Sequence, residues 1–393
     1  MGQTESKMTN YENDEMEILK KKIDQEGPAA ANTYLEESIN SWKTVDVKLA
    51  VSGCAATGKS TFINTLRGVK RGDADYAEVG FGDTTLQVTA YPHPDNARIV
   101  YYDLPGVGTL EVKKENYIND MKICDYDFIF IFFDKVINED TLWLVSELDK
   151  LGKPYCFVRS KLDDDVRNAK RDHMDAELVI PMIRKKIEQS IQKHSELGNA
   201  RNIFFISCVD SSIGEMSELI AYVESYMNEF KRLAALSSLV VFSEDIINLK
   251  YKVLKTRIRK VSVAAAAIGA TPVPGLDIAL NIALLVKEVV HYINCFGLSP
   301  KRMEALKSFD SSKLKCSQIF LPGAQLAVFV TSRLGIYVSI MAAESMLDLF
   351  LPFVGSLISG ATSAIITYRF LSSVLDDLKH DSIIVYRHIV QHQ

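Results

Sequence analysis

The sequence predicts an α/β domain with a parallel-dominated sheet, joined to an all-α helical domain formed by the N-terminal and C-terminal segments. From Val45 to about Arg232, β-prone runs alternate with helical runs, and continuously apolar strands separated by helices indicate a parallel sheet covered on both faces. After residue 233 no strand pattern recurs, and residues 11–42 also favour helices. The chain has 393 residues, which is more than a single domain with one hydrophobic core usually contains. We therefore expect a helical segment over 1–44, a nucleotide domain over 45–232 and an apolar helical domain over 233–393.

The individual elements follow from apolar periodicity and from Pro and Gly breaks. The strand candidates are Val45–Ser52, Leu86–Tyr91, Arg98–Asp103, Phe128–Asp134, Pro154–Arg159 and Asn202–Ser207. The helix candidates between them are Lys59–Leu66, Lys114–Met121, Glu139–Leu151, Met174–His194 and Ile213–Arg232. Later helices are expected over Ser243–Ala267, Leu276–Phe296, Pro300–Lys307, Gln325–Leu334 and Ile336–Leu375.

The first motif lies directly after the first strand candidate. Gly53–Ser60 fits the phosphate-binding pattern G-x-x-x-x-G-K-[ST], in which backbone N–H groups face the phosphates and a helix begins. Lys59 would hold the β- and γ-phosphates, and the Ser60 hydroxyl would bind Mg²⁺. The expected phosphate contacts are Gly53, Ala55, Ala56, Thr57, Gly58, Lys59, Ser60 and Thr61.

Two further segments are expected to sense the γ-phosphate. Asp103–Gly106 fits D-x-x-G at a strand end, which places the Asp103 carboxylate near Mg²⁺ and the Gly106 N–H near the γ-phosphate. In the loop Gly80–Thr85, we choose Thr85 as the Mg²⁺ ligand, with Thr84 as the alternative and simple β-propensity as the competing interpretation. The candidate catalytic residues are therefore Lys59, Thr85 and Gly106, and the metal ligands are Ser60, Thr85 and Asp103.

The base is indicated by Ser160–Asp163, which resembles the guanine motif [NT]-K-x-D. Asp163 would accept two N–H bonds from guanine and Lys161 would pack over the ring, whereas adenine would leave the carboxylate unpaired. Ser160 departs from the usual Asn or Thr, which puts the loop-tying hydrogen bond in doubt, and a solvated acidic turn is the alternative. Ser207 and Cys208 follow the last strand, where a backbone N–H meets guanine O6. Together these motifs favour GTP over ATP.

The residue after Gly106 is Val107, where Ras-like enzymes have a Gln that orients the attacking water. An aliphatic side chain cannot orient water. We infer slow intrinsic hydrolysis, or a water positioned by another group assembled when two nucleotide domains meet.

These motifs resemble the immunity-related GTPase family, the interferon-inducible dynamin-like GTPases. The resemblance rests on Gly53–Asn64, Asp83–Thr85, Tyr91–Pro94, Asp103–Gly108, Tyr126–Phe128 and Phe157–Asp163. It implies GTP-dependent self-association, hydrolysis stimulated by that association, myristoyl-assisted binding to intracellular membranes and action against vacuoles that contain pathogens. Lys59 is typical of the GKS type of this family.

Composition constrains the partners and the compartment. The formal net charge is −5, which gives no electrostatic reason to expect nucleic acid. The six cysteines form no C-x-x-C pair and favour a reducing cytosol, and no histidine spacing indicates zinc, so Mg²⁺ is the one metal implied.

Two features concern membranes. Met1–Ser6 matches the pattern in which Gly2 is myristoylated, although an ordinary start of the chain is the alternative, and one acyl chain binds membrane with an association constant of only about 10⁴ M⁻¹. Leu349–Tyr368 lacks charge and is long enough to span, but Pro352, Gly355 and Gly360 interrupt it. We favour buried core or reversible insertion over a constitutive span.

Three hypotheses result. The leading one is a cytosolic GTPase, peripherally bound to intracellular membranes, that is activated by self-association. The second is a GTP-loaded scaffold with negligible hydrolysis, supported by Val107. The third is an integral membrane GTPase anchored by Leu349–Tyr368.

Overall fold

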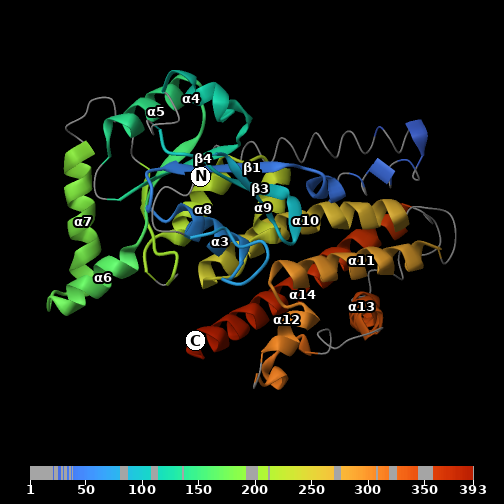
Figure 1. The fold of residues 1–393 in the computed structure, drawn as a ribbon. Coiled ribbons are helices and arrows are strands. Elements are labelled where there is room, and N and C mark those ends of the chain that lie inside the picture. Colours follow the sequence, from blue (N-terminus) through green and yellow to red (C-terminus); the bar gives the residue numbers. More distant parts are fainter. Residues whose placement is uncertain are drawn as a thin grey trace. The chain divides into compact units, whose positions relative to one another are not determined.

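The computed structural model describes residues 21, 25–27, 30, 33–34, 37, 39–79, 87–107, 114–134, 137–191, 202–210, 213–269, 276–306, 309–317, 325–343 and 357–392. Contacts divide the chain into two compact units (Figure 1). One unit is Thr44–Ile246, and the other combines Met1–Lys43 with Ile247–Gln393. The N-terminal and C-terminal segments thus belong to one unit.

The first unit contains a six-stranded sheet in the order β2-β3-β1-β4-β5-β6. Its strands are β1 (Val47–Gly53), β2 (Thr89–His93), β3 (Asn96–Asp103), β4 (Phe128–Phe133), β5 (Tyr155–Arg159) and β6 (Ile203–Phe205). All neighbours pair in parallel except β2 and β3, which form an antiparallel hairpin. This confirms the predicted α/β fold with a parallel-dominated sheet.

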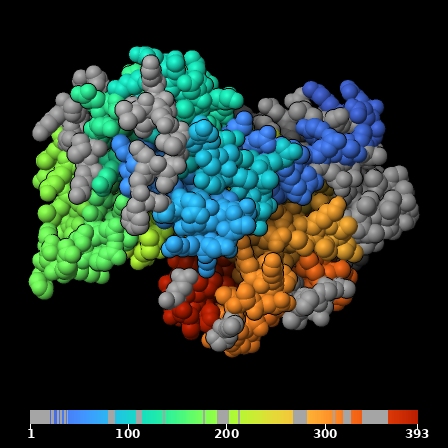
Figure 2. Space-filling model, viewed as in Figure 1, coloured from blue at the N-terminus to red at the C-terminus, as the bar shows by residue number. Residues whose placement is uncertain are grey.

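The β2–β3 hairpin forms one edge of the sheet, with β2 as the outermost strand. Pro92 lies within β2, and a Pro is tolerated in an edge strand because one side of the strand needs no donor. Most of β2 and the preceding residues 70–75 are exposed, and they lie on the face shown in light blue to cyan in Figure 2.

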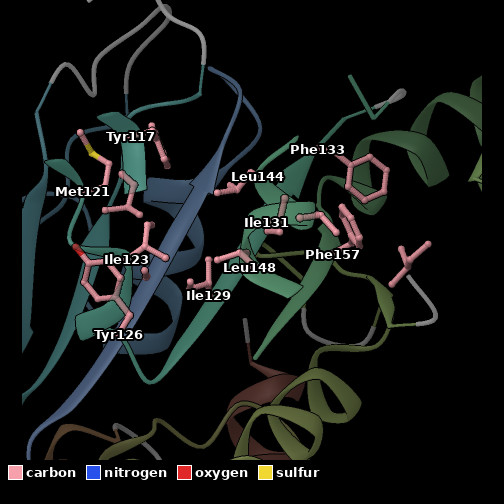
Figure 3. Close-up of a cluster of buried hydrophobic side chains, with 14 of the residues drawn as sticks. Tyr117, Met121, Ile123, Tyr126, Ile129, Ile131, Phe133, Leu144, Leu148 and Phe157 are labelled. Atoms are coloured by element: carbon pink, nitrogen blue, oxygen red, sulfur yellow. The ribbon is translucent and has the colours of Figure 1, made fainter. Parts of the chain in front are cut away.

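Strand β4 at the centre is buried along its whole length and packs on both faces. Because side chains alternate along a strand, Phe130 and Phe132 face one side, where both rings lie about 5 Å from the ring of Phe62 in α3 (Lys59–Arg67). The other side carries Ile129, Ile131 and Phe133 (Figure 3). These pack with residues of α4 (Lys114–Asp120), η2 (Ile123–Asp125) and α5 (Glu139–Lys150). The aromatic run of β4 is therefore part of the core.

The remaining helices of this unit are α6 (Leu162–Arg171), α7 (Ala176–Ile191), α8 (Met216–Ser225) and α9 (Glu229–Ser238). The predicted single helix over Ile213–Arg232 is wrong, because the Asn228 side chain accepts a hydrogen bond from the Lys231 N–H and caps a new helix. Helix α9 packs against β1 and β3, so the first unit extends to Ile246 and not to the expected residue 232.

Among its described residues, the second unit has helices and no strand. It contains η1 (Ser41–Lys43), most of α10 (Glu244–Gly269), α11 (Leu276–Cys295), α12 (Pro300–Ala305), η4 (Ser311–Lys313), α13 (Gln325–Ala343) and α14 (Leu357–Gln391). Helices α11, α13 and α14 pack against one another. The predicted helix over Ile336–Leu375 is wrong, because α13 continues through Gly335 to Ala343 and α14 begins at Leu357.

Polar contacts join the parts of the second unit. Arg257 of α10 pairs with Glu288 of α11 at 2.6 Å, and the same guanidinium donates to the Ile39 carbonyl near the N-terminal end. Asp381 of α14 is fully buried and accepts hydrogen bonds from the N–H groups of Lys315 and Cys316. Buried charges need such partners, so these contacts fix the packing of the helices.

Among the described residues, Asn281–Ala305 is long and apolar enough to cross a membrane by length and composition, and 44% of that window is buried. A core helix meets the same test, and this stretch contains Glu288, which is only 3% exposed and ion-paired. Of the predicted apolar stretch Leu349–Tyr368, residues 349–356 lie outside the described residues, and the remainder belongs to α14.

Candidate nucleotide-binding site

The phosphate loop joins the end of β1 to the start of α3. Its backbone takes positive φ angles at Gly53 (138°), Ala56 (58°) and Gly58 (90°). Left-handed residues at these intervals curl the chain into a concavity suited to an anion, and such a conformation in Ala56 is uncommon for a residue with a Cβ. At Gly53 a Cβ would lie 2.1 Å from the Phe132 carbonyl oxygen, so only glycine fits beside β4. Ala55 is exposed, and Thr61 lies in the first turn of α3.

Two side chains brace this loop. The Lys59 ammonium is buried and donates to the carbonyls of Gly53 at 3.0 Å and Cys54 at 3.1 Å. The Thr57 hydroxyl also donates to the Cys54 carbonyl, at 2.8 Å. The predicted phosphate lysine is thus held at the loop, where its charge faces any anion bound there.

The predicted metal ligands Ser60 and Asp103 meet because β1 and β3 are neighbours. In the strand register Val51 lies opposite Asp103, and the Ser60 hydroxyl donates to the Asp103 carboxylate at 3.3 Å. The Asp103 side chain is buried, being 2% exposed. A hydroxyl and a carboxylate are the oxygen ligands that Mg²⁺ prefers, so the pair fits this ion. Elsewhere in the described ranges, no cluster of three His, Cys, Asp or Glu side chains forms a metal site.

The segment after Asp103 is fixed by a residue that the sequence did not indicate. Tyr117 of α4 is fully buried, and its hydroxyl donates to the Pro105 carbonyl at 2.8 Å and contacts the Ser52 hydroxyl at 3.0 Å. Burial raises the pKa of Tyr117 well above its usual value, so the phenol stays protonated and donates. This contact orders the backbone immediately before Gly106.

Val107 is half-buried and packs against the hydrophobic cluster that includes Leu104 and Tyr117. Its side chain therefore contributes to the core. This agrees with the interpretation that Val107 does not orient a water molecule.

The predicted base-binding loop leads from β5 into α6. Lys161 has φ of 65° and is the N-terminal cap of α6, so Asp163 lies in the first helical turn. The Asp163 carboxylate accepts a hydrogen bond from the Ser207 hydroxyl at 2.9 Å. That hydroxyl in turn accepts from the N–H groups of Val209 and Asp210. These contacts join Asp163 to Ser207, and they show that Asp163 is a hydrogen-bonded residue of a helix and not part of a turn. The roles of Lys161, Asp163 and Ser207 in binding the base stay predictions.

The Ser207 N–H donates to the Ile213 carbonyl at 3.2 Å. It is therefore committed within the protein, and we expect the backbone contact to guanine O6 to come from Cys208. Burial and the nearby Asp163 raise the pKa of the Cys208 thiol to about 12, so this side chain is neutral at physiological pH.

Direct hydrogen bonds tie this loop to the phosphate loop. The Ser160 hydroxyl donates to the Thr57 carbonyl, which supplies the loop-tying bond that the departure from Asn or Thr had put in doubt. A Cβ at Gly58 would lie 2.8 Å from the Ser160 hydroxyl oxygen, so the approach requires glycine. On the other side, the Thr65 hydroxyl of α3 donates to the Cys208 carbonyl at 3.0 Å.

Arg159 is a second residue that sequence reasoning missed. Its side chain is 4% exposed, pairs with Asp165 at 2.6 Å and donates to the Ser160 carbonyl at 2.8 Å. A buried cation directly before the Ser160–Asp163 motif was the available signal, because a buried Arg needs carboxylate or carbonyl partners. Arg159 therefore positions the base-binding loop.

Three predicted residues have no structural description. Thr84 and Thr85 lie in the segment 80–86, and Gly2 lies in the segment 1–20, both outside the described residues. Their roles stay predictions.

Comparisons with known proteins identify the family of the chain. A family model described as Interferon-inducible GTPase matches residues 13–317. Interferon-inducible GTPase 5 of Rattus norvegicus is 27% identical over 389 residues, which cover 94% of this chain and 81% of the relative. T-cell-specific guanine nucleotide triphosphate-binding protein 2 of Mus musculus is 30% identical over 279 residues, which cover 70% of this chain and 66% of that protein.

Among solved structures, Era of Aquifex aeolicus bound to GDP and aluminium fluoride is 20% identical, with a TM-score of 0.33. The likeness covers 58% of this chain and 69% of Era. Because this TM-score is low, the likeness to Era carries no argument, and the strand order and pairing described above define the fold.

Proposed function

The chain belongs to the interferon-inducible GTPase family and is a GTP-binding hydrolase, and we propose that GTP-dependent self-association activates its hydrolysis. The proposed setting is cell-autonomous immunity at intracellular membranes. GTP and GDP are the ligands of the site, and Mg²⁺ is its proposed cofactor, held by Ser60 and Asp103, where it would neutralise charge on the phosphates.

The observation that carries the proposal is Val107, the residue directly after the D-x-x-G segment. Its side chain packs into the core and has no polar atom with which to orient water. The other parts of the site are assembled in a single unit, including the phosphate loop, Asp103 and Asp163. We infer that the missing element is supplied when two nucleotide domains meet, so that turnover depends on association.

The chain's own residues would act as follows. Lys59 moves from the carbonyls of Gly53 and Cys54 onto the β- and γ-phosphates, where its charge is better compensated. Asp163, oriented by Ser207, accepts the two N–H donors of guanine. Gly106, next to the carbonyl held by Tyr117, offers its N–H to the γ-phosphate.

The test is GTP turnover per molecule, measured across a wide range of protein concentrations with and without liposomes. A self-activated enzyme accelerates as its concentration rises. Turnover that stays at background at every concentration would contradict self-activation and would support the second candidate, a GTP-loaded scaffold. The Lys59→Ala variant is the control, because its weakened nucleotide binding should lower both the basal and the accelerated rate at a limiting GTP concentration.

Membrane association is a separate part of the proposal. It is supported by the myristoylation pattern at Gly2 and by the apolar character of the helical segments after residue 233. Extraction of cell membranes with alkaline carbonate distinguishes the alternatives, since a peripheral protein is released and an integral one stays in the pellet. Gly2→Ala should lower membrane binding and leave GTP turnover in solution unchanged.

A further inference from the structure

The sheet of the nucleotide unit has a second site, at the amino-terminal ends of its strands, opposite the end that carries the phosphate loop. The phosphate loop, Asp103 and the base-binding loop all follow the carboxyl ends of strands, whereas this cavity lies where β5 and β6 begin. Its volume is about 260 Å³, and the lining residues used below are Asp149, Lys153, Tyr155, Asn202, Tyr222 and Tyr226. None of them takes part in the nucleotide site.

The aromatic rings of the cavity are fixed by internal hydrogen bonds. Asn202 donates to the Tyr222 hydroxyl, which also bonds the Tyr226 hydroxyl at 2.9 Å, and the Tyr155 hydroxyl donates to Asp149 at 3.1 Å. The Tyr222 and Tyr226 ring centroids are 5.0 Å apart in an edge-to-face arrangement. The Tyr155 hydrogen and one of the two hydrogens of the Tyr222–Tyr226 pair are engaged in these bonds, and the tyrosine rings also have electron-rich faces that can attract a cation.

The charge of the cavity favours a cation. Asp149 is exposed and keeps acceptor capacity beyond its bond from Tyr155. Helices α5 and α8 both end here, with caps at Leu151 and Tyr226, and helix C-termini carry partial negative charge. Lys153 also lines the cavity, but its ammonium is bound to the carbonyls of Cys124 and Tyr126.

The rim indicates that the ligand is part of a protein. Tyr226 lines the cavity and is 52% exposed, and Leu151, which directly precedes the lining residue Gly152, is 42% exposed, so apolar surface adjoins the acidic, aromatic cavity. A partner that covers this rim while inserting a cationic side chain would bury both. A planar guanidinium can stack on tyrosine faces and still reach a carboxylate, which a lysine ammonium does less well.

We propose that the cavity between the ends of α5 and α8 and the starts of β5 and β6 binds an arginine side chain presented by a partner protein. The site is independent of GTP hydrolysis, since its residues lie at the opposite ends of the strands from the nucleotide site. Its occupant would dock the nucleotide unit onto another protein.

The test uses the full chain labelled with ¹³C at its tyrosine rings and titrated with a capped Gly-Arg-Gly peptide. We expect saturable chemical-shift changes confined to a few tyrosine signals. These should include the signals of Tyr155 and Tyr226, which are assigned because they disappear in the Tyr155→Phe and Tyr226→Phe variants. The corresponding Gly-Lys-Gly peptide should bind more weakly. The neutral citrulline peptide should bind at least about threefold more weakly than the arginine peptide. Equal binding of the arginine and citrulline peptides, or no shift at all, would overturn the proposal.

Variants separate binding from folding. Asp149→Asn should lower affinity for the arginine peptide at least about threefold, while Asp172→Asn, which alters an exposed carboxylate outside the cavity, should not. Both variants should keep the wild-type rate of GTP turnover, which shows that the unit is folded. If Asp149→Asn binds the peptide as tightly as the wild type does, the assigned site is wrong.

Discussion

The contact between Tyr117 and the segment before Gly106 gives the sharpest test of the site. The Tyr117 hydroxyl makes two buried contacts, to the Pro105 carbonyl at 2.8 Å and to the Ser52 hydroxyl at 3.0 Å. A neutral hydrogen bond contributes about 0.5–1.5 kcal/mol, so Tyr117→Phe should lower the free energy of unfolding by about 1–3 kcal/mol. For a domain of about 200 residues, each kcal/mol shifts Tm by roughly 2–4 °C.

We expect the variant's GDP-bound form to melt roughly 2–12 °C below the wild type in a thermal denaturation assay. Because the freed Pro105 carbonyl precedes Gly106, the rate constant for GTP hydrolysis should also fall while GDP affinity stays unchanged. Tyr102→Phe is the matched control, since the Tyr102 ring packs at a tilt against Tyr126 and the hydrogen bonds to Pro105 and Ser52 come from Tyr117. A Tm within about 1 °C of the wild type, with unchanged hydrolysis, would refute this role of Tyr117.

Further substitutions test the rest of the site. Lys59→Ala should weaken GDP and GTP binding by roughly 10- to 100-fold in a fluorescence titration, because a charged donor to phosphate is lost. Asp163→Asn should shift preference from GTP toward xanthosine triphosphate, and unchanged GTP affinity would contradict the guanine assignment. Gly53→Ala should destabilise the fold, seen as a lower Tm, because the new Cβ meets the Phe132 carbonyl. Alkylation at about pH 8 should modify the exposed cysteines before Cys208, whose pKa is raised to about 12.

The strands were predictable because burial on both faces leaves a direct trace in the sequence. A continuous apolar run such as Phe128–Phe133, set between charged helical segments, is typical of a strand inside a parallel sheet. The D-x-x-G motif at a strand end predicted that Asp103 would lie near the Mg²⁺ held by Ser60. The structure supplies the reason, because β1 and β3 are parallel neighbours and their carboxyl ends lie side by side.

The start of a helix was harder to predict from the sequence where the helix begins inside a functional motif. Helix α6 starts at Leu162, within Ser160–Asp163, whereas the acidic run Asp163–Asp165 is by composition also compatible with a solvated turn. Asp163, Asp164 and Asp165 lie in its first turn, where negative charge is stabilised by the helix dipole, so the run was in fact a helix-start signal. Asn228 was a similar missed signal for the start of α9.

Tyr117 and Arg159 were not predictable in their roles, because their partners are set by the tertiary fold. Tyr117 reaches Ser52, which is distant along the chain, only after α4 has packed on the sheet. No periodicity or local pattern encodes which hydroxyl a buried tyrosine will meet. Arg159 could have been flagged as a charge in an apolar strand, yet its partner Asp165 is one of three adjacent acidic residues that the sequence alone does not distinguish.

The hydrogen bonds among the loops explain why Ser160 can replace the usual Asn or Thr. Its hydroxyl reaches the Thr57 carbonyl because Gly58 has no Cβ and allows the two loops to approach closely. Thr65 holds the carbonyl of Cys208 from the opposite side, and Ser207 holds Asp163. Protein atoms alone therefore link the phosphate loop to the base-binding loop and to the segment around Ser207 and Cys208, and such preorganisation limits the conformational entropy that a ligand must remove. On this reasoning Ser160→Ala should lower the affinities for GTP and GDP by the same factor, since the substitution removes a hydrogen bond from a part of the site that both nucleotides share.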